Sequence, residues 1–498
     1  MSGRGDYLAV DMGASGVRLI HGAFDGARFA LTELDRFENG PVRVLGDLHW
    51  DVLGLWRQLR QGLARFGRDG GEPPAGVGVD TWGVDFALLD ERGSLLGTPF
   101  HYRDRRTQGM PELLARRISS ERMYACTGIQ VMQINTMYQL LAMAEANDPR
   151  LSDAARLLMM PDLFAYWLSG VQAGEYTIAS TSQMLDATRR EWATGLLAEI
   201  GLPESILPPL VIPGSVLGNL HPDLADAIPG FEETQVIAVG GHDTASAVAA
   251  IPELDESSAF ISSGTWSLVG VEVGEPVLDQ RARELNFTNE GGVGGTIRLL
   301  KNVAGLWLLQ ESRRRWRREG LEVGWQEILA RAEAAPAFRS IIDPDAPEFL
   351  SPDDMVAAIA GHCRRIRQPE PDGVGPVVRC CLESLALRYR WVLDALEELT
   401  GRNVETIRIV GGGSRNDLLN QLTADACGRP VVAGPVEATA LGNLMVQAIA
   451  TGRLAGVEAG RQAVADSVHL RRFEPTPHAG TRDAWQEAYD RFRAVVTR

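Results

Sequence analysis

Asp243 is the residue of this sequence whose surroundings best suit acid–base chemistry. It follows β-forming residues and the pair Gly240-Gly241 in the stretch 236–248, VIAVGGHDTASAV, and small residues that suit a helix come after it. This pattern predicts a strand, a tight turn and a helix N-terminus, where the helix dipole favours an ionised carboxylate. Such a carboxylate can take the proton of a hydroxyl that attacks a phosphate, with His242 as a hydrogen-bond partner of the substrate. A buried aspartate that only caps its helix would leave the same pattern.

A phosphate site is suggested near the start of the chain. Asp11 ends an apolar stretch, residues 13–16 read Gly-Ala-Ser-Gly, and Arg18 lies just beyond them. A turn of small residues exposes backbone N–H groups that bind phosphate oxygens. Arg18 can reach the same phosphates, and Asp11 can hold Mg²⁺ through water. An ordinary glycine turn beside a surface arginine is the alternative.

A third stretch, residues 80–85, reads Asp-Thr-Trp-Gly-Val-Asp. Gly83 allows a ligand to approach closely, Trp82 offers a flat apolar face, and Asp80 and Asp85 offer acceptors for hydroxyl groups. This mixture suits a ligand with many hydroxyls, such as a sugar. A hairpin whose tryptophan belongs to the core would look similar.

A fourth stretch, Gly-Gly-Gly-Ser at residues 411–414, precedes a predicted helix. A dinucleotide-binding fingerprint would need glycine where Asn416 stands, so that interpretation is weak. A glycine run before a helix lets an adenosine lie against the backbone, although a close strand–helix turn needs the same glycines.

The elements that must position these residues occur twice along the chain. Residues 7–24 and 259–273 both predict a strand, a small polar turn and a second strand, while 236–248 and 407–419 both predict a strand, glycines and a helix. The repeat predicts two α/β halves, residues 1–250 and 251–498, that close on two substrates around a central cleft. Further helices are predicted by apolar periodicity, at 51–66, 303–318, 374–400, 438–451 and 480–496. The last of these could pack on either half.

Composition excludes several classes of function. The 498 residues carry a formal net charge of −16, which disfavours nucleic acid and anionic membranes as partners. No apolar run approaches the roughly 18 residues of a membrane helix, and the first residues lack the apolar region of a signal peptide. We therefore expect a soluble cytoplasmic protein.

Cysteine and lysine usage narrows the chemistry further. The five cysteines form no CxxC pair, which argues against zinc and thioredoxin-like sites and favours free thiols, with a Cys363–Cys380 bridge left open. Lys301 is the only lysine and follows a leucine, so the Gly-Lys of a P-loop is missing.

Taken together, these motifs resemble the FGGY family of carbohydrate kinases, which has the actin-like ATPase fold, over essentially the whole chain. The C-terminal signature of the family is matched by Gly411-Gly412-Gly413-Ser414-Arg415-Asn416, Gln421, Ala424-Asp425, Gly428, Pro430-Val431, Glu437 and Ala440-Leu441-Gly442. The branch of the family that phosphorylates L-rhamnulose is matched by residues 79–86, 241–247, 263–267, 288–292, 301–302 and 305–310.

The resemblance implies two actin-like, ribonuclease H-like domains, each with a mixed sheet flanked by helices. It implies ATP-dependent phosphorylation of L-rhamnulose at the C1 hydroxyl, with Mg²⁺, and Asp243 as the proton acceptor. The implied sugar contacts are Gly83, His242, Asp243, Thr244 and Asn302. The implied ATP contacts are Ala14, Ser15, Gly16, Val17, Arg18, Thr265, Gln310 and Gly412, with Asp11 near the metal.

One departure from the family pattern lies in the first hairpin. Members of this branch tend to have Ala-Ser-Ser-Gly-Arg, where this chain has Ala-Ser-Gly-Val-Arg at residues 14–18. One hydroxyl is missing, so residues 16 and 17 are expected to contact phosphate through the backbone.

Other functions fit parts of the same pattern. A kinase of another ketose, such as L-fuculose or xylulose, would need the same base and the same ATP contacts. A sugar- or nucleotide-binding module of this fold without activity would bind ligand but release no ADP. For each of these functions we expect small-molecule ligands, and we expect the protein to be a monomer or a homodimer.

Overall fold

The first hairpin of the computed structural model forms as the sequence predicts. Strand β1 (Gly5–Gly13) pairs antiparallel with β2 (Gly16–Phe24), and Gly13 lies opposite Gly16 across a tight turn. Strand β6 (Gly76–Thr81) runs parallel to β1 on its other side. The hairpin therefore lies inside a mixed sheet, with its turn at the carboxyl end of β1.

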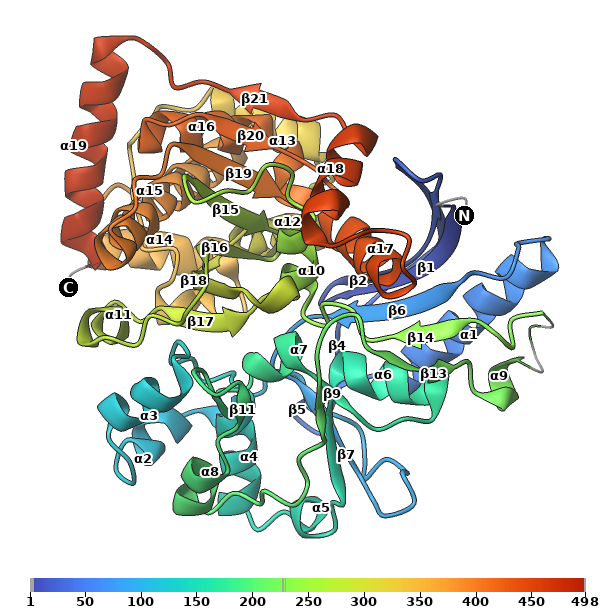
Figure 1. Cartoon of the computed structure of the whole chain (residues 1–498). Coiled ribbons are helices and arrows are strands. Elements are labelled where there is room, and N and C mark those ends of the chain that lie inside the picture. Colours follow the sequence, from blue (N-terminus) through green and yellow to red (C-terminus); the bar gives the residue numbers. More distant parts are fainter. Residues whose placement is uncertain (1–3, 226–227, 229, 497–498) are drawn as a thin grey trace. The chain divides into compact units, whose positions relative to one another are not determined.

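The structure describes residues 4–225, 228 and 230–496 (Figure 1), so the outermost ends of the two expected halves lie outside the described residues. Two compact units form, and they are described separately. The first unit comprises Met1–Glu253, Glu272–Leu299 and Ala438–Val468, and the second comprises Leu254–Val271, Leu300–Glu437 and His469–Arg498.

The main sheet of the first unit has six strands in the order β13-β14-β6-β1-β2-β3. Its remaining strands are β3 (Phe29–Glu38), β13 (Val216–Asn219) and β14 (Gln235–Ile237). Strand β14 runs parallel to β6, as β6 does to β1. Three neighbouring parallel strands therefore bring their carboxyl ends to one edge of the sheet.

The second large sheet has seven strands in the order β17-β18-β16-β15-β19-β20-β21. Its strands are β15 (Ser258–Ser263), β16 (Trp266–Val273), β17 (Thr288–Gly291), β18 (Ile297–Ala304), β19 (Thr406–Val410), β20 (Val431–Ala433) and β21 (Arg471–Phe473). Here β15 forms the antiparallel hairpin with β16 and has β19 parallel on its other side. The hairpin repeats that of β1 and β2, as the sequence predicts. Strand β19, which was expected to correspond to the strand at residues 236–248, takes the place beside the hairpin that β6 has in the first sheet.

Shorter elements complete the chain. The shorter strands, which pair in twos, are β4 (Pro41–Val44), β5 (Asp47–Trp50), β7 (Phe86–Leu89), β8 (Arg156–Met159), β9 (Gly174–Glu175), β10 (Leu185–Asp186), β11 (Glu191–Trp192) and β12 (Leu210–Val211). The first unit holds helices α1 (Val52–Arg68), α2 (Met110–Leu114), α3 (Ser120–Thr127), α4 (Thr136–Glu145), α5 (Pro149–Ser152), α6 (Met160–Ser169), α7 (Tyr176–Ser180), α8 (Thr194–Ile200), α9 (Pro222–Ala225), α10 (Asp243–Ala249), α11 (Gln280–Glu284), α17 (Ala438–Ala450) and α18 (Val457–Ser467). The second holds α12 (Trp307–Arg318), α13 (Trp325–Glu333), α14 (Met355–Arg365), α15 (Val374–Thr400), α16 (Asp417–Cys427) and α19 (Ala479–Val496).

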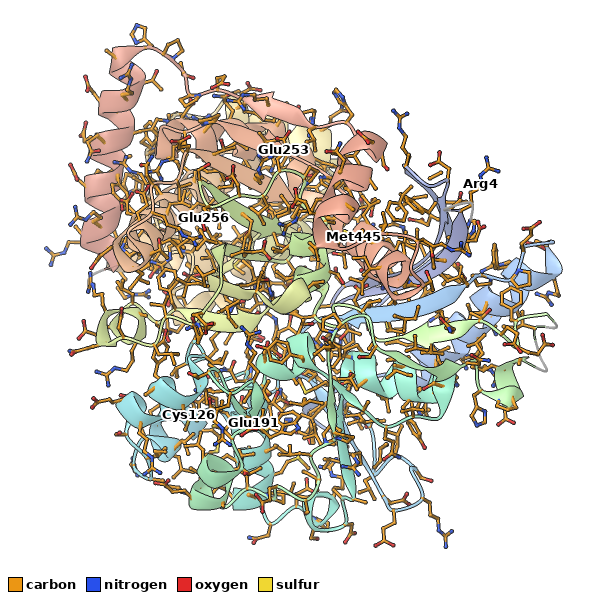
Figure 2. All side chains as sticks on the ribbon, in the orientation of Figure 1. Arg4, Cys126, Glu191, Glu253, Glu256 and Met445 are labelled. Atoms are coloured by element: carbon orange, nitrogen blue, oxygen red, sulfur yellow. The ribbon has the colours of Figure 1, made fainter. Side chains whose placement is uncertain are left out.

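Helix α17, which comes late in the sequence, packs on the sheet that begins the chain. It contacts β1, β2 and β6, and its residue Met445, labelled in Figure 2, shares a buried core with Tyr7 and Ile20. Helices α1 and α6 also pack on this sheet, α1 against β3 and α6 against β6 and β14. The sheet is therefore flanked by helices, as expected for the fold class.

One predicted helix was partly wrong. Residues 303–318 were expected to be helical, but β18 continues to Ala304 and α12 begins only at Trp307. Gly305 explains the break, because a Cβ there would lie 2.5 Å from the carbonyl carbon of Trp266. The chain must turn sharply where it passes this neighbouring hairpin, and an apolar run of this length suits a strand as well as a helix.

Three smaller expectations have clear outcomes. Helix α1 begins after Asp51, whose side chain accepts the Gly54 N–H as an N-cap. Helix α19 packs against α15 and α16 of the second unit. All five cysteines are free thiols.

Among the described residues, no helix combines the length and apolarity that a membrane crossing requires.

We expect Gly442→Ala to lower the free energy of unfolding by about 1–3 kcal/mol, the usual penalty of overpacking. A Cβ at this position of α17 would overlap the carbonyl oxygen of Ser246 in α10, so the two helices would have to separate. Urea denaturation measures the change. Gly361→Ala in α14 is the matched control, since a Cβ there meets no atom within 4 Å and should leave stability equal or slightly higher. Equal effects of the two substitutions would contradict this account of the contact.

Candidate active site

Three aspartates lie at the carboxyl ends of neighbouring strands in the first unit. Asp11 of β1 and Asp80 of β6 are partners in the parallel ladder, and Thr81 forms an isolated parallel bridge with His242. Asp243 follows that bridge as the first residue of α10. The sheet therefore gathers carboxylates that are far apart in sequence at the edge where α/β proteins bind ligands.

The two strand carboxylates differ in their partners. Arg18 on β2 donates a 2.5 Å hydrogen bond to Asp11. Asp80 is fully buried and accepts a 2.6 Å hydrogen bond from Asn443 of α17 through one oxygen. Its other oxygen, Oδ1, is buried without a hydrogen-bond partner. Burial raises the pKa of Asp80 well above its ordinary value, and the neighbouring charge of Asp11 adds to the rise.

Asp243 keeps access to solvent although protein surrounds it. Its side chain remains 30% exposed, while the rest of α10 is buried. The Thr244 hydroxyl donates to Oδ1 over 3.1 Å, and Nε2 of His242 lies 3.6 Å from the same oxygen. Burial raises the pKa of Asp243 above the ordinary aspartate value of 3.8, and His242 opposes the rise. The result is a reachable carboxylate that binds a proton more readily than an ordinary aspartate does.

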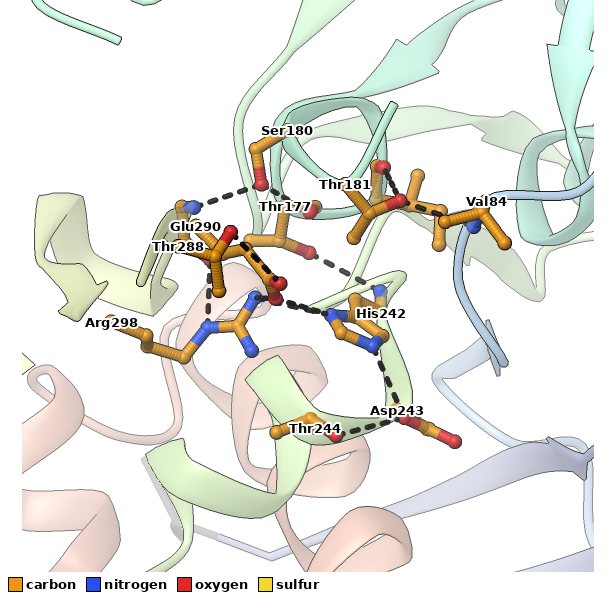
Figure 3. Close-up of polar contacts among 12 residues, drawn as sticks. Val84, Thr177, Ser180, Thr181, His242, Asp243, Thr244, Thr288, Glu290 and Arg298 are labelled. Atoms are coloured by element: carbon orange, nitrogen blue, oxygen red, sulfur yellow. Dashed lines mark hydrogen bonds and ion pairs between the residues drawn. The ribbon is translucent and has the colours of Figure 1, made fainter. Parts of the chain in front are cut away.

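The other side of His242 faces a buried ion pair (Figure 3). Nδ1 lies 3.2 Å from Oε2 of Glu290 on β17 and 3.2 Å from Nη2 of Arg298 on β18. The Arg298 side chain is fully buried, and Glu290 is nearly so. The imidazole is therefore held between Asp243 on one side and a charged pair on the other.

Glu175, the N-cap of α7, fixes the loop that leads to Asp243. Its carboxylate accepts hydrogen bonds from the N–H groups of Thr177, Ile178 and Gly241 and from the Thr177 hydroxyl. The same hydroxyl oxygen accepts the N–H of His242. Burial raises the pKa of Glu175 to about 6, and these donors oppose the rise. The loop is thus held by buried hydrogen bonds on both sides of its turn.

Gly83 lies close to His242. A Cβ at position 83 would lie 3.5 Å from Nε2 of His242, so the glycine leaves open space beside that nitrogen. Val84, the next residue, has φ of 68°, an uncommon conformation for a β-branched residue. It is held there by the Thr181 hydroxyl, which accepts its N–H, and by Thr136, which donates to its carbonyl.

The expectation that Asp85 offers an acceptor to a ligand was wrong. Its buried carboxylate already accepts from the indoles of Trp50 and Trp82, from the N–H of Tyr102 and from the amide of Gln139. Trp82 is itself buried and packs against the Trp50 ring at 4.0 Å between centroids. The Asp85 carboxylate therefore holds the loop together, whereas Asp80 keeps one oxygen without a hydrogen-bond partner.

The raised pKa of Asp243 predicts the low-pH behaviour of an enzyme that uses it as a base. A base acts in its ionised form, so kcat/KM is expected to fall as the pH drops through the pKa of Asp243. Burial places that pKa above 3.8. Initial rates between pH 4 and 8, with circular dichroism to confirm that the fold is intact, measure this acidic limb. If kcat/KM stays constant down to pH 4, Asp243 is not the base.

In the second unit, two of the four predicted contacts lie at neighbouring strand ends, and a third reaches one of them from a helix. Thr265 lies in the turn between β15 and β16, and its hydroxyl donates to the Gln310 side chain of α12 over 3.4 Å. Gly412 follows β19, the parallel neighbour of β15. The glycine turn packs tightly on the hairpin, because a Cβ at Gly413 would overlap the Ser263 hydroxyl. Close backbone approach is therefore required here.

The predicted residues divide between the two units. The first unit holds Asp11, Ala14, Ser15, Gly16, Val17, Arg18, Gly83, His242, Asp243 and Thr244, and the second holds Thr265, Asn302, Gln310 and Gly412. Asn302 lies half-buried on β18, in the part of the strand that belongs to the second unit.

Sequence reasoning missed four residues around Asp80 and Asp243. Glu175, Arg298 and Asn443 lie in no motif that was singled out, and Glu290 lies in the stretch 288–292, which carried the resemblance without a role. Only the position of Glu290 within a recognised stretch was a usable signal. The others are found through contacts between distant parts of the chain.

Comparison with known proteins places the chain. The model of the FGGY family of carbohydrate kinases, N-terminal domain, matches residues 7–250, and that of the C-terminal domain matches 259–451. A protein named rhamnulokinase from Bacteroides thetaiotaomicron is 46% identical over 491 residues, covering 99% of each chain. One of the same name from Enterococcus faecalis is 40% identical over 476 residues, covering 95% of this chain and 94% of the relative. The crystal structure of gluconate kinase from Lactobacillus acidophilus shares the fold, with a TM-score of 0.80 at 16% identity over 99% of this chain and 97% of that one. On this evidence, the chain belongs to the FGGY family of carbohydrate kinases.

Proposed function

We propose that the chain transfers the γ-phosphoryl group of ATP to the C1 hydroxyl of L-rhamnulose, giving L-rhamnulose 1-phosphate and ADP. Relatives named rhamnulokinase align with nearly all of it at 46% and 40% identity. The surroundings of Asp243 carry the proposal, because an accessible carboxylate with a raised pKa suits a base for a sugar hydroxyl. Asp243 takes the proton of the C1 hydroxyl as the hydroxyl oxygen attacks the γ-phosphorus in line, and ADP leaves.

The sugar is held mainly by the groups around that base. His242 presents Nε2 beside the space left by Gly83, and Thr244 bonds to Asp243 itself. Asn302 on β18 is the further sugar contact that the family resemblance implies. Hydrogen bonds to several hydroxyls orient the attacking oxygen, which is a large part of catalysis in phosphoryl transfer.

The nucleotide contacts come from two turns. Ala14 and Ser15 form the hairpin turn, and residues 16–18 begin β2. We place the phosphate oxygens at this end of the hairpin, where Arg18 adds a positive charge next to Asp11. In the second unit, Thr265, Gln310 and Gly412 are the nucleotide contacts that the family resemblance implies. At residues 16 and 17 the contacts are backbone contacts, because neither side chain has a hydrogen-bonding group.

The acidic pair fits Mg²⁺ held through water. Asp11 and Asp80 are partners on neighbouring strands, and Oδ1 of Asp80 is buried without a hydrogen-bond partner. Within the described part of the chain, no three acidic, histidine or cysteine side chains lie close enough to hold a metal by themselves. Mg²⁺ commonly keeps several waters and takes one or two carboxylates beside phosphate oxygens, so this arrangement suits it. When bound, the ion neutralises charge on the phosphates.

A panel of sugars tests the proposal. ADP release is measured with L-rhamnulose, L-fuculose and xylulose, and kcat/KM is expected to be highest for L-rhamnulose by about tenfold or more. Phosphorus NMR of the product should show a phosphate ester at C1. If another ketose gives a higher kcat/KM, that ketose is the substrate in place of L-rhamnulose. Binding of ATP with no ADP release for any sugar would instead favour a binding module without activity.

A further inference from the structure

The ion pair of Glu290 and Arg298 lies against Nδ1 of His242. Three atoms form a triangle: Nη2 of Arg298 lies 3.2 Å from Nδ1 of His242 and 3.3 Å from Oε2 of Glu290, and those two atoms are 3.2 Å apart. Figure 3 shows the guanidinium and the carboxylate together at one edge of the imidazole, with Asp243 at the other. The imidazole has one proton when neutral, and this triangle influences which nitrogen carries it.

Arg298 is anchored so that its Nη2 keeps this position. Its Nε donates to the carbonyl of Gly291 over 3.0 Å, and the N–H of Gly291 donates in turn to the Ser180 hydroxyl over 2.8 Å. The Arg298 side chain has no exposed surface. A guanidinium stays charged and can only donate, so Nη2 donates to Nδ1 of His242, while Oε2 of Glu290 is its ion-pair partner at 3.3 Å.

The contact with Arg298 requires a lone pair on Nδ1 of His242. The proton of a neutral imidazole must then lie on Nε2, which faces Oδ1 of Asp243 at 3.6 Å. With the opposite tautomer, Nδ1–H would point at Glu290 and Nε2 would turn a lone pair toward the Asp243 carboxylate. That second arrangement turns a lone pair toward a carboxylate, and it would lose the hydrogen bond that Arg298 donates to Nδ1.

We propose that Arg298 and Glu290 are positioning residues that hold His242 in the tautomer with the proton on Nε2, aimed at Asp243 and at the acceptor sugar. Arg298 selects the tautomer by occupying Nδ1. Glu290 neutralises Arg298, so that a full positive charge does not lie unpaired behind the imidazole. The link to catalysis rests on the proposed function, whereas the tautomer itself does not.

Nitrogen-15 NMR of protein labelled at histidine measures the tautomer without any substrate. The His242 signals are identified by their loss in His242→Gln. We expect Nδ1 to be the nitrogen without a proton in the wild type. In Arg298→Gln, Glu290 remains as an acceptor, so the proton is expected to move to Nδ1. In Glu290→Gln, Arg298 remains and Nδ1 is expected to stay unprotonated.

Kinetics then test the connection to phosphoryl transfer. Arg298→Gln is expected to lower kcat/KM for the sugar by about 10- to 100-fold, since small misplacements near a reacting group have effects of this size. KM for ATP is expected to change less than about twofold. Asp148→Asn is the matched control, because Asp148 pairs with the partly buried Arg150 at 2.5 Å in the same unit without contacting His242. It should leave the tautomer and the sugar kinetics unchanged.

Each outcome bears on the proposal. A wild-type proton on Nδ1, or on both nitrogens, overturns it whether or not L-rhamnulose is the substrate. An unchanged tautomer in Arg298→Gln overturns the role of Arg298. Equal kinetic losses in Arg298→Gln and Asp148→Asn would show a general structural effect instead. Arg298→Lys keeps the buried charge and serves if Arg298→Gln does not fold, with the tautomer expected to shift in part toward Nδ1–H.

Discussion

Replacing Asp243 with asparagine is expected to lower kcat by about 10²- to 10⁴-fold, the usual contribution of a general base. Asparagine has nearly the same shape but does not accept the proton of the attacking hydroxyl. The Thr244 hydroxyl can still donate to the amide oxygen, and the side chain is partly exposed, so the fold should persist. ADP release with saturating sugar and ATP gives kcat, and calorimetry gives the affinity for ATP, which should change far less.

A control separates loss of the base from loss of structure. Asp279 caps the short helix α11 in the same unit by accepting the Ala282 N–H, and it is exposed. Asp279→Asn should therefore keep wild-type turnover. Near-normal turnover in Asp243→Asn would remove Asp243 from the role of base, whereas equal losses in both variants would indicate damage to the first unit.

The second large effect is expected on stability, from Glu175→Ala. The substitution removes the acceptor of four buried donors, which are the N–H groups of Thr177, Ile178 and Gly241 and the Thr177 hydroxyl. A buried donor without a partner costs roughly 1–3 kcal/mol. We therefore expect the free energy of unfolding to fall by about 4 kcal/mol or more, measured by urea denaturation. Turnover should fall as well, because the loop before Asp243 loses its support.

Glu175→Gln and Ser119→Ala set the scale for this effect. Glutamine keeps one acceptor oxygen, so its loss of stability should be smaller than that of alanine. Ser119 caps α3 by accepting the Arg122 N–H at an exposed position, so Ser119→Ala should cost only about 1 kcal/mol. If Glu175→Ala costs no more than Ser119→Ala, then Glu175 is an ordinary helix cap and does not hold the loop.

The sequence predicted those parts of the site that depend on local pattern. Strands followed by glycines and a small helix identified the positions of Asp243 and of Gly412, and the hairpin around residues 13–16 formed as expected. Local pattern suffices here because alternation, turn residues and helix caps depend on neighbours in the chain. The division of the chain at residue 250 and the individual roles of the site residues stay predictions.

Predictions that depended on the surroundings of a side chain were less accurate. Asp80 and Asp85 looked equivalent in the sequence, but Asp85 accepts four hydrogen bonds from its neighbours while Asp80 keeps an oxygen without a hydrogen-bond partner. Likewise, residues 303–318 suited a helix by periodicity, and the close approach of Gly305 to Trp266 ended the strand and delayed the helix. Such differences arise from packing between distant residues, which the local periodicity of a sequence does not reveal.

The residue types at the strand ends, and with them the candidate base, the hairpin turn and the glycine turn, follow from the sequence alone. Only the tertiary structure decided what surrounds the base. Asn443 reaches Asp80 across 363 residues, and Arg298 reaches His242 across 56. These contacts form because α17 packs on the first sheet and because β17 and β18 bring a buried ion pair to the imidazole. The physical reason is that a hydrogen bond depends on distance in space, which the chain sets only after its elements have packed.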